Sequence, residues 1–306
     1  MSVIPKERQG MTFWPGLSLL LGLLVSTHAA LAGEISVKVD YEYRGIYQFT
    51  DMVDTAMNYL ASEVTAQPAN ARVRFGLATL YYRKGMVQEA KQQFESIVTL
   101  HPDDADGYFH LGMVFLHEGN FEQFREHMEK TISLNPSHKG AYNNLAKAYV
   151  ITKDYDKARD VWETAIKRMS KEESFYFNQS ILLMSHYKDK RDIVLRNMTS
   201  AISLSSKEEY FFILGWAHLE QHQYDAARSA MQKAFDLNPK NVYALLAVAT
   251  TYKELGNFEK AIETAERAKG IYPGNPADID AEIQAYKDAY KKWKKSQERS
   301  KDIGPP

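Results

Sequence analysis

The side chains best suited to metal or acid–base chemistry are histidines with helical spacing. His218 and His222 lie four residues apart on a predicted helix, and His110 and His117 lie seven apart on another. Glu220 does not complete the H-E-x-x-H pattern, and neither pair has an evident third ligand. The chain also lacks a glycine-rich phosphate loop and a serine elbow. We therefore predict a protein that is not an enzyme, with no catalytic residues, no metal site and no cofactor.

Composition narrows the function classes further. The 306 residues are 44% hydrophobic and 25% charged, which is typical of soluble globular proteins. The net charge of −1 gives no general indication of nucleic-acid binding. The absence of cysteine excludes disulfides, thiol catalysis, cysteine-ligated zinc and the acylated cysteine of a bacterial lipoprotein. Function is therefore expected to lie in a binding surface.

The elements that would form such a surface follow a 34-residue unit, which is most regular from Lys139 to Glu172. Apolar residues three or four apart place one face on each of two short helices. These are Tyr142, Leu145, Ala146 and Tyr149 in the first half, and Ala158, Trp162 and Ala165 in the second. Asp154 and Tyr155 stand where the chain would turn. The unit is therefore predicted to be a pair of amphipathic helices in which the alanines permit close approach.

The same offsets recur in units that begin at Ala71, Ala105, Glu208 and Val242. Glycine occupies the predicted inter-helix turn in three of the five units, as Gly85, Gly119 and Gly256. This pattern resembles the tetratricopeptide repeat family, whose period is also 34 residues. The resemblance covers residues 71–172 and 208–275. It implies an all-α fold, a right-handed superhelical solenoid of helix pairs with a C-terminal capping helix.

In that family, the concave face is lined by the second, fifth and ninth residues of each first helix. The resemblance therefore implies a partner protein, bound as a peptide or helix in a concave groove. Large apolar groups dominate the corresponding positions, and three polar residues of one repeat are suited to orienting a peptide. The predicted partner-binding residues are Phe75, Phe109, Met113, Asn143, Asn144, Lys147, Phe212, Trp216, Tyr243 and Leu246. The alternative is that several of these side chains are buried by the curvature of the stack or by the N-terminal segment.

Two departures interrupt the pattern. Residues 173–207 form a block of 35 residues that matches well only at Tyr176 and Ala201, and we interpret it as a degenerate repeat rather than a loop. Phe124 stands where the pattern has alanine, so its helix pair is expected to separate or shift, or simply to repack locally.

Residues 1–32 are predicted to be an export signal. Lys6 and Arg8 precede a short apolar core, and Ala30-Leu31-Ala32 forms an A-x-A site with cleavage after Ala32. The alternative is a retained anchor, because residues 13–32 contain no charge. Both interpretations place the repeats outside the cytoplasm, in the periplasm or secreted.

The next segment, residues 33–70, is predicted to contain an extended stretch and a lead helix. Apolar and polar residues alternate from Ile35 to Tyr43, which is typical of a strand. This stretch either packs on the first helix or pairs with another chain by edge addition. Thr50 is expected to cap a helix that runs to about Val64 and resembles the second half of a decayed repeat.

Residues 276–306 are predicted to form the capping helix and a basic tail. Ile279, Ile283, Tyr286, Tyr290 and Trp293 make one apolar seam. The other side is basic, which indicates either a solvated face or a weak contact with anionic lipid or an acidic partner. Membrane contact is expected only here or through an uncleaved signal.

Three functional hypotheses remain. The first is an exported interaction scaffold, and the resemblance suggests roles in assembling envelope machinery, pili or polysaccharide-export complexes. The second is a homo-oligomeric, self-assembling scaffold that uses the N-terminal strand and the repeat ends. The third is a histidine metal-binding protein.

Overall fold

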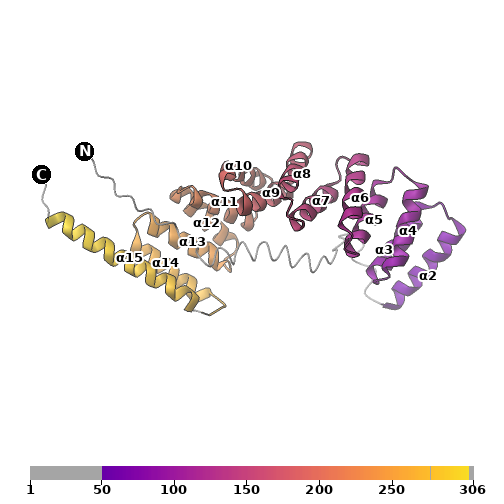
Figure 1. Cartoon of the computed structure of the whole chain (residues 1–306). Coiled ribbons are helices and arrows are strands. Elements are labelled where there is room, and N and C mark those ends of the chain that lie inside the picture. The colour runs from indigo at the N-terminus through magenta and orange to yellow at the C-terminus, as the bar shows by residue number, and fades with distance from the viewer. Residues whose placement is uncertain (1–49, 276, 303–306) are drawn as a thin grey trace. The chain divides into compact units, whose positions relative to one another are not determined.

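The computed structural model describes residues 50–275 and 277–302, which contain fourteen α-helices and one short 3₁₀ helix (Figure 1). The chain divides into two units, residues 1–59 and 60–306, and α2 (Thr50–Ala66) crosses the boundary between them. The predicted strand and export signal lie outside the described residues.

Consecutive helices of the second unit pack as antiparallel pairs, as the sequence pattern predicts. The pairs are α3 (Ala71–Arg83) with α4 (Val87–Leu100), α5 (Ala105–His117) with α6 (Phe121–Leu134), α7 (Lys139–Ile151) with α8 (Tyr155–Arg168), α9 (Glu173–His186) with α10 (Arg191–Leu204), α11 (Glu208–Glu220) with α12 (Tyr224–Leu237), and α13 (Val242–Glu254) with α14 (Phe258–Ile271).

Side-chain caps set where many of these helices begin. Asn70, Asp104, His138 and Asn241 each accept a hydrogen bond from a backbone N–H in the first turn of a first helix. Asn120, Asp154 and Asn257 do the same for second helices. Each cap satisfies a backbone donor that would otherwise have no partner within the helix. The repeat pattern therefore encodes the helix starts as well as the buried faces.

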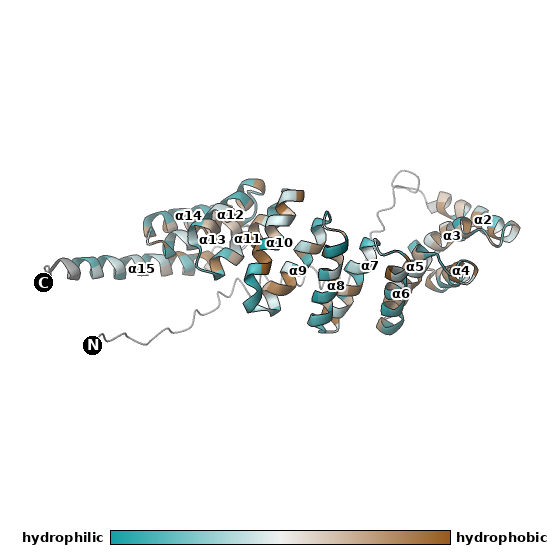
Figure 2. Ribbon diagram, turned by 90° about the horizontal axis from the view of Figure 1, so that it is seen from above, coloured by the Kyte–Doolittle hydropathy of each residue, from teal (hydrophilic) through white to brown (hydrophobic). Residues whose placement is uncertain are grey.

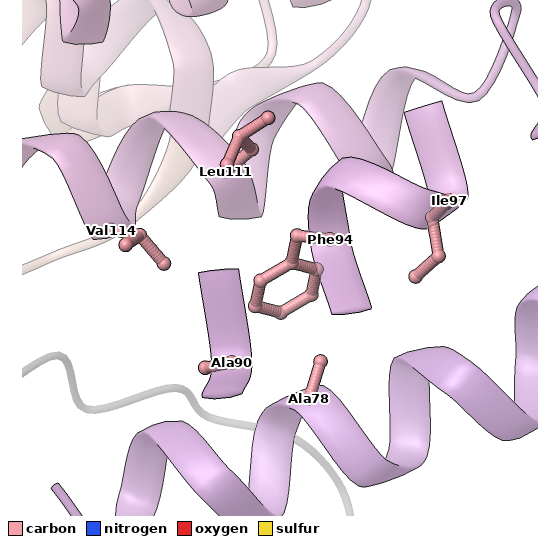
Figure 3. Packing of buried hydrophobic residues seen from close by; sticks show 6 residues of the cluster. All are labelled: Ala78, Ala90, Phe94, Ile97, Leu111 and Val114. Atoms are coloured by element: carbon pink, nitrogen blue, oxygen red, sulfur yellow. The ribbon is translucent and has the colours of Figure 1, made fainter. Parts of the chain in front are cut away.

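The core runs between the helices of each pair and between neighbouring pairs. Figure 3 shows Phe94 of α4 among small and branched residues of α3, α4 and α5, all nearly inaccessible to solvent. These neighbours are Ala78, Ala90, Ile97, Leu111 and Val114. Ala78 of α3 and Ala90 of α4 leave the space that the benzyl ring fills, so the large side chain packs against small ones of its own and of the neighbouring helix.

Phe124 does not separate its helix pair. The side chain is fully buried, and α5 still lies so close to α6 that a Cβ added at Gly112 would be 3.0 Å from the Cβ of His127. Glycine on the first helix thus permits the close approach that alanine permits on the second helix of other repeats.

The weak block, residues 173–207, contains the helix pair α9 and α10. The connection between its two helices is longer than the connection between α7 and α8 in the preceding repeat. Helix α9 has 14 residues where α7 has 13, and residues 187–190 separate α9 from α10 where only residues 152–154 separate α7 from α8. The 3₁₀ turn Lys188–Lys190 occupies this longer connection.

Helix α15 (Ala277–Asp302) packs along α14. Ile279, Ile283 and Tyr286 are buried in the contact. The Tyr286 hydroxyl donates to Glu282 and lies 2.9 Å from the Thr250 hydroxyl of α13. Burial raises the pKa of Glu282 to about 7.

Of the helices in the described part of the chain, none is long and apolar enough to cross a membrane.

A left-handed residue closes the turn within five helix pairs. Gly85, Gly119 and Gly256 have φ of 75° to 78°, whereas Lys153 and His222 adopt φ of 63° and 59° at the equivalent positions.

We expect Lys153→Gly to raise the free energy of unfolding by about 0.5–1 kcal/mol, because relief of the Cβ clash outweighs the added freedom of the unfolded chain. Urea unfolding at unchanged slope would measure this gain. Lys153→Ala keeps the Cβ and serves as the control, and a similar gain from Ala would contradict the explanation.

Candidate functional site

The candidate site is the first-helix face, which we define as the second, fifth and ninth residues of α3, α5, α7, α9, α11 and α13. The fifth residues pack between consecutive repeats. Phe75 lies 4.8 Å from His110, and Phe109 lies 4.5 Å from His138, measured between ring centroids. A Cβ added at Gly140 would be 3.1 Å from the Phe109 ring, so the glycine permits this contact. The large apolar groups of this face therefore hold neighbouring repeats together.

Three of the predicted binding residues are buried. Met113 and Phe212 are 6% exposed, and Leu246 is 2% exposed. Phe75 and Phe109 are half-buried. Burial by neighbouring helices, the alternative that the sequence left open, therefore describes Met113, Phe212 and Leu246 in this structure.

Asn143 connects three helices. Its Oδ1 accepts hydrogen bonds from Trp162 Nε1 of α8 and Asn178 Nδ2 of α9, both at 3.0 Å. Its Nδ2 donates to Ser174 Oγ of α9 at 3.2 Å. The neighbouring Asn144 donates to the sulfur of Met113 at 3.3 Å. Most of the bonding capacity of the Asn143 amide is therefore used within the protein, where it ties α7 to α8 and α9.

Other predicted residues remain accessible. Trp216 and Tyr243 are half-buried, like Phe75 and Phe109, and Lys147 is exposed. The Trp216 indole stacks on Phe212 at 6.5 Å and donates to Glu220 Oε1 at 3.3 Å. Although Lys147 reaches solvent, surrounding protein atoms desolvate its ammonium group and lower its pKa.

Sequence reasoning missed the contribution of α9 to this face. Carrying the same offsets to Glu173 gives Ser174, Phe177 and Ile181, and the last two are half-buried apolar groups. Phe177 lies 5.3 Å from the Tyr210 ring of α11. The same offsets apply to α9 because the irregularity of this repeat begins only at the C-terminal end of α9. The positions of Phe177 and Ile181 on the first-helix face could therefore have been predicted from the sequence.

The histidines do not form the pairs expected for a metal site. His218 is in the last turn of α11, but His222 lies beyond the end of that helix in a left-handed turn, so the prediction that both lie on one helix is wrong. His218 bonds Gln223 at 2.6 Å and His222 bonds Tyr224 at 2.8 Å. His110 is buried among aromatic rings, whereas His117 is exposed. In the described ranges, no three His, Asp or Glu side chains are grouped to hold a metal ion.

The comparisons with known proteins agree with this architecture. Models of the tetratricopeptide repeat match residues 51–112, residues 105–138 and 140–168, and residues 214–276. Together these ranges cover more than half of the chain, and they do not include α9 and α10. No curated protein matches the chain.

Several solved structures share the fold. The C-terminal part of a TPR repeat-containing protein from Cytophaga hutchinsonii has a TM-score of 0.64 at 12% identity, with 74% of this chain and 93% of that chain covered. YrrB, a TPR protein with an unusual peptide-binding site, has a TM-score of 0.54 at 21% identity, with 62% and 97% covered. PilF of Pseudomonas aeruginosa has a TM-score of 0.52 at 17% identity, with 76% and 98% covered.

These observations together identify the chain. It consists of repeated helix pairs with 34-residue spacing, capped first helices and interlocked first-helix faces. Scaffolds of this kind are typically non-enzymatic and bind protein partners. The chain belongs to the tetratricopeptide repeat family and is a scaffold for protein–protein interaction.

Proposed function

We propose that this protein is an exported scaffold that binds a segment of a partner protein on its first-helix face. The observation that carries the proposal is that Trp216 and Tyr243, on neighbouring first helices, are only partly buried. Amphipathic rings of this kind are the side chains most often found at the energetic centre of protein interfaces. Phe177 and Ile181 extend the apolar character of the face onto α9.

The polar residues define how the partner would be oriented. Asn143 is engaged within the protein, so it positions α9 and acts on the partner only indirectly. Lys147 is an exposed cation at the ninth position of α7, and its partial desolvation strengthens its attraction for an acidic group or a backbone carbonyl. The partner segment is therefore proposed to combine an apolar anchor with an acceptor near Lys147. YrrB offers a precedent, since the same fold carries a peptide-binding site in that protein.

Replacing Trp216 with Ala is expected to weaken partner binding by on the order of 2 kcal/mol, or about 30-fold. Partners would first be identified by mass spectrometry of what co-purifies with the wild-type protein. Their affinities for wild type and for Trp216→Ala and Tyr243→Ala would then be measured by calorimetry. Leu204→Ala and Leu237→Ala remove exposed apolar groups from second helices and serve as controls. Equal affinity of the folded Trp216 variant and wild type would contradict the proposed site.

Export is proposed from residues 1–32 alone. Cell fractionation followed by N-terminal sequencing tests it. A mature chain that begins at Gly33 outside the cytoplasm supports cleavage, whereas an intact N-terminus in the membrane fraction supports a retained anchor. A chain found whole in the cytoplasm would contradict both.

The self-assembly hypothesis depends on residues 33–45, which are not among the described residues. Its test is deletion of that segment followed by light scattering. Loss of oligomers with unchanged helicity would favour self-assembly, and oligomers that persist would exclude this segment as their cause.

A further inference from the structure

The C-terminal half of α15 combines exposed lysines with an aromatic cluster. The apolar seam that is buried at Tyr286 becomes accessible towards the C-terminus, where Tyr290 is half-buried and Trp293 is 42% exposed. Phe258 of α14 lies 5.7 Å from Tyr290 and 5.8 Å from Trp293, measured between ring centroids. Helix α15 continues past the helices on which it packs, and this part is strongly hydrophilic apart from the cluster (Figures 1 and 2).

Lysines surround the exposed indole. Because each residue of an α-helix turns by about 100°, Lys292 and Lys294 project to either side of Trp293, and Lys291 and Lys295 lie behind it. All four side chains are exposed. The Lys294 ammonium lies 4.2 Å from the Tyr290 ring centroid, which places positive charge directly beside the aromatic cluster.

Three of the neighbouring acidic groups are already engaged. Glu259 of α14 accepts from the Tyr290 hydroxyl, and Glu266 pairs with Lys287 at 3.2 Å. Asp288 lies 3.8 Å from Lys291. Five lysines and two acids lie between residues 287 and 298, a local balance of +3 in a protein whose net charge is −1. The positive charge is therefore concentrated at this end of the chain.

We propose that the C-terminal half of α15 binds the surface of an anionic lipid bilayer, with Trp293 at the headgroup level and Lys292 and Lys294 beside it among the lipid phosphates. Lys291 and Lys295, on the far side of the helix, add positive charge within the range of the attraction. Tryptophan is favoured at this interface because its ring is apolar and its N–H is polar. Lysine stems lie along the apolar boundary while their ammonium groups reach the headgroups. A protein partner fits this surface less well, because protein interfaces are depleted in lysine.

The test compares three full-length proteins in sedimentation with vesicles of phosphatidylcholine, with and without phosphatidylglycerol. The first is wild type, and the second replaces Lys291, Lys292, Lys294 and Lys295 with Gln. The third is a control of equal charge change in which Lys171, Lys233, Lys240 and Lys260 are replaced with Gln. Since each lysine near an anionic surface contributes about fivefold, the α15 variant is expected to lose at least about tenfold in partition coefficient and the control about twofold or less. The N-terminal segment is identical in all three, so it cannot cause a difference between them.

A second readout isolates the indole. The fluorescence of wild type minus that of Trp293→Phe reports Trp293 alone. Its emission maximum is expected to shift to the blue when anionic vesicles are added. In 0.5 M salt, which screens the attraction, the maximum should return to its original wavelength. Equal loss in both lysine variants, or equal binding to neutral and anionic vesicles, would overturn the proposal. Binding to soluble polyglutamate without binding to vesicles would also overturn it and would indicate an acidic polypeptide.

Discussion

Replacing Arg191 with Met is expected to lower the free energy of unfolding by about 3 kcal/mol. Arg191 is 7% exposed and begins α10. Its guanidinium donates to the carbonyl oxygens of Leu183, Met184 and Tyr187 at 2.9 to 3.0 Å, and its Nε–H pairs with Glu220 of α11. Methionine retains the apolar stem but none of these donors. The loss leaves a carbonyl at the end of α9 unsatisfied and removes the ionic partner of Glu220.

Arg196→Met is the matched control, because Arg196 is exposed on the same helix, and we expect a change within about 0.5 kcal/mol. Urea unfolding followed by circular dichroism measures both variants. Hydrogen exchange should show the loss of protection centred on α9, α10 and α11. Adding Glu220→Gln to Arg191→Met should cost less than the sum of the single changes, since the carboxylate has already lost its partner. Equal stability of the Arg191 and Arg196 variants would show that the buried guanidinium contributes nothing.

Lowering the pH from 7 to 4 is expected to remove about 3 kcal/mol of stability through His110 alone. The imidazole is buried, stacked at 5.4 Å on Phe94 and edge-on to Phe75. This burial lowers its pKa from 6.5 to about 4. Between pH 6.5 and 4 the unfolded chain binds a proton that the folded protein does not. Stability is therefore complete above pH 6.5, falls as the pH is lowered through this window, and loses nothing further from this group below pH 4.

His110→Gln removes the titrating group while keeping a polar side chain of similar size. Its stability should depend less steeply on pH than that of wild type across this window, whatever its absolute value. His117→Gln, on the exposed side of the same helix, is the matched control for the substitution itself. Asp106 and His138 lie close enough to influence this imidazole, and both are present in all three proteins. Parallel profiles for wild type and His110→Gln would refute the expected role of His110.

Local spacing alone predicted most of the fold. The small residues Ala146, Ala158 and Ala165 are fully buried, and the large Trp162 on the same helix as Ala158 and Ala165 is buried as well. The turn positions followed from three glycines, and Lys153 and His222 occupy the two equivalent positions without one. These features depend on residues close in sequence, so the amino-acid pattern carries them directly.

The degenerate repeat was harder to interpret because its core includes buried polar residues among the apolar ones. Gln179 and Asn197 are buried and hydrogen-bonded to each other at 2.8 Å, and Arg191 of the same repeat is also buried. An apolar periodicity cannot reveal such a core, since polar residues are favourable inside only when distant partners satisfy their hydrogen bonds. Those partners are known only once the helices have been placed.

For the candidate site, too, the sequence predicted one part and the tertiary structure decided the other. The sequence by itself determined which residues occupy the first-helix face, because helical periodicity assigns each residue to a face. Only the tertiary structure decided which of them are accessible. Leu246 and Met113 are covered by neighbouring helices, and Asn143 is engaged by α8 and α9, whereas Trp216 is partly accessible and Lys147 is exposed. Accessibility depends on how closely successive repeats approach each other. That distance is set by contacts between side chains 30 or more residues apart in the sequence. The contacts of Asn144 with Met113 and of Asn143 with Asn178 are examples.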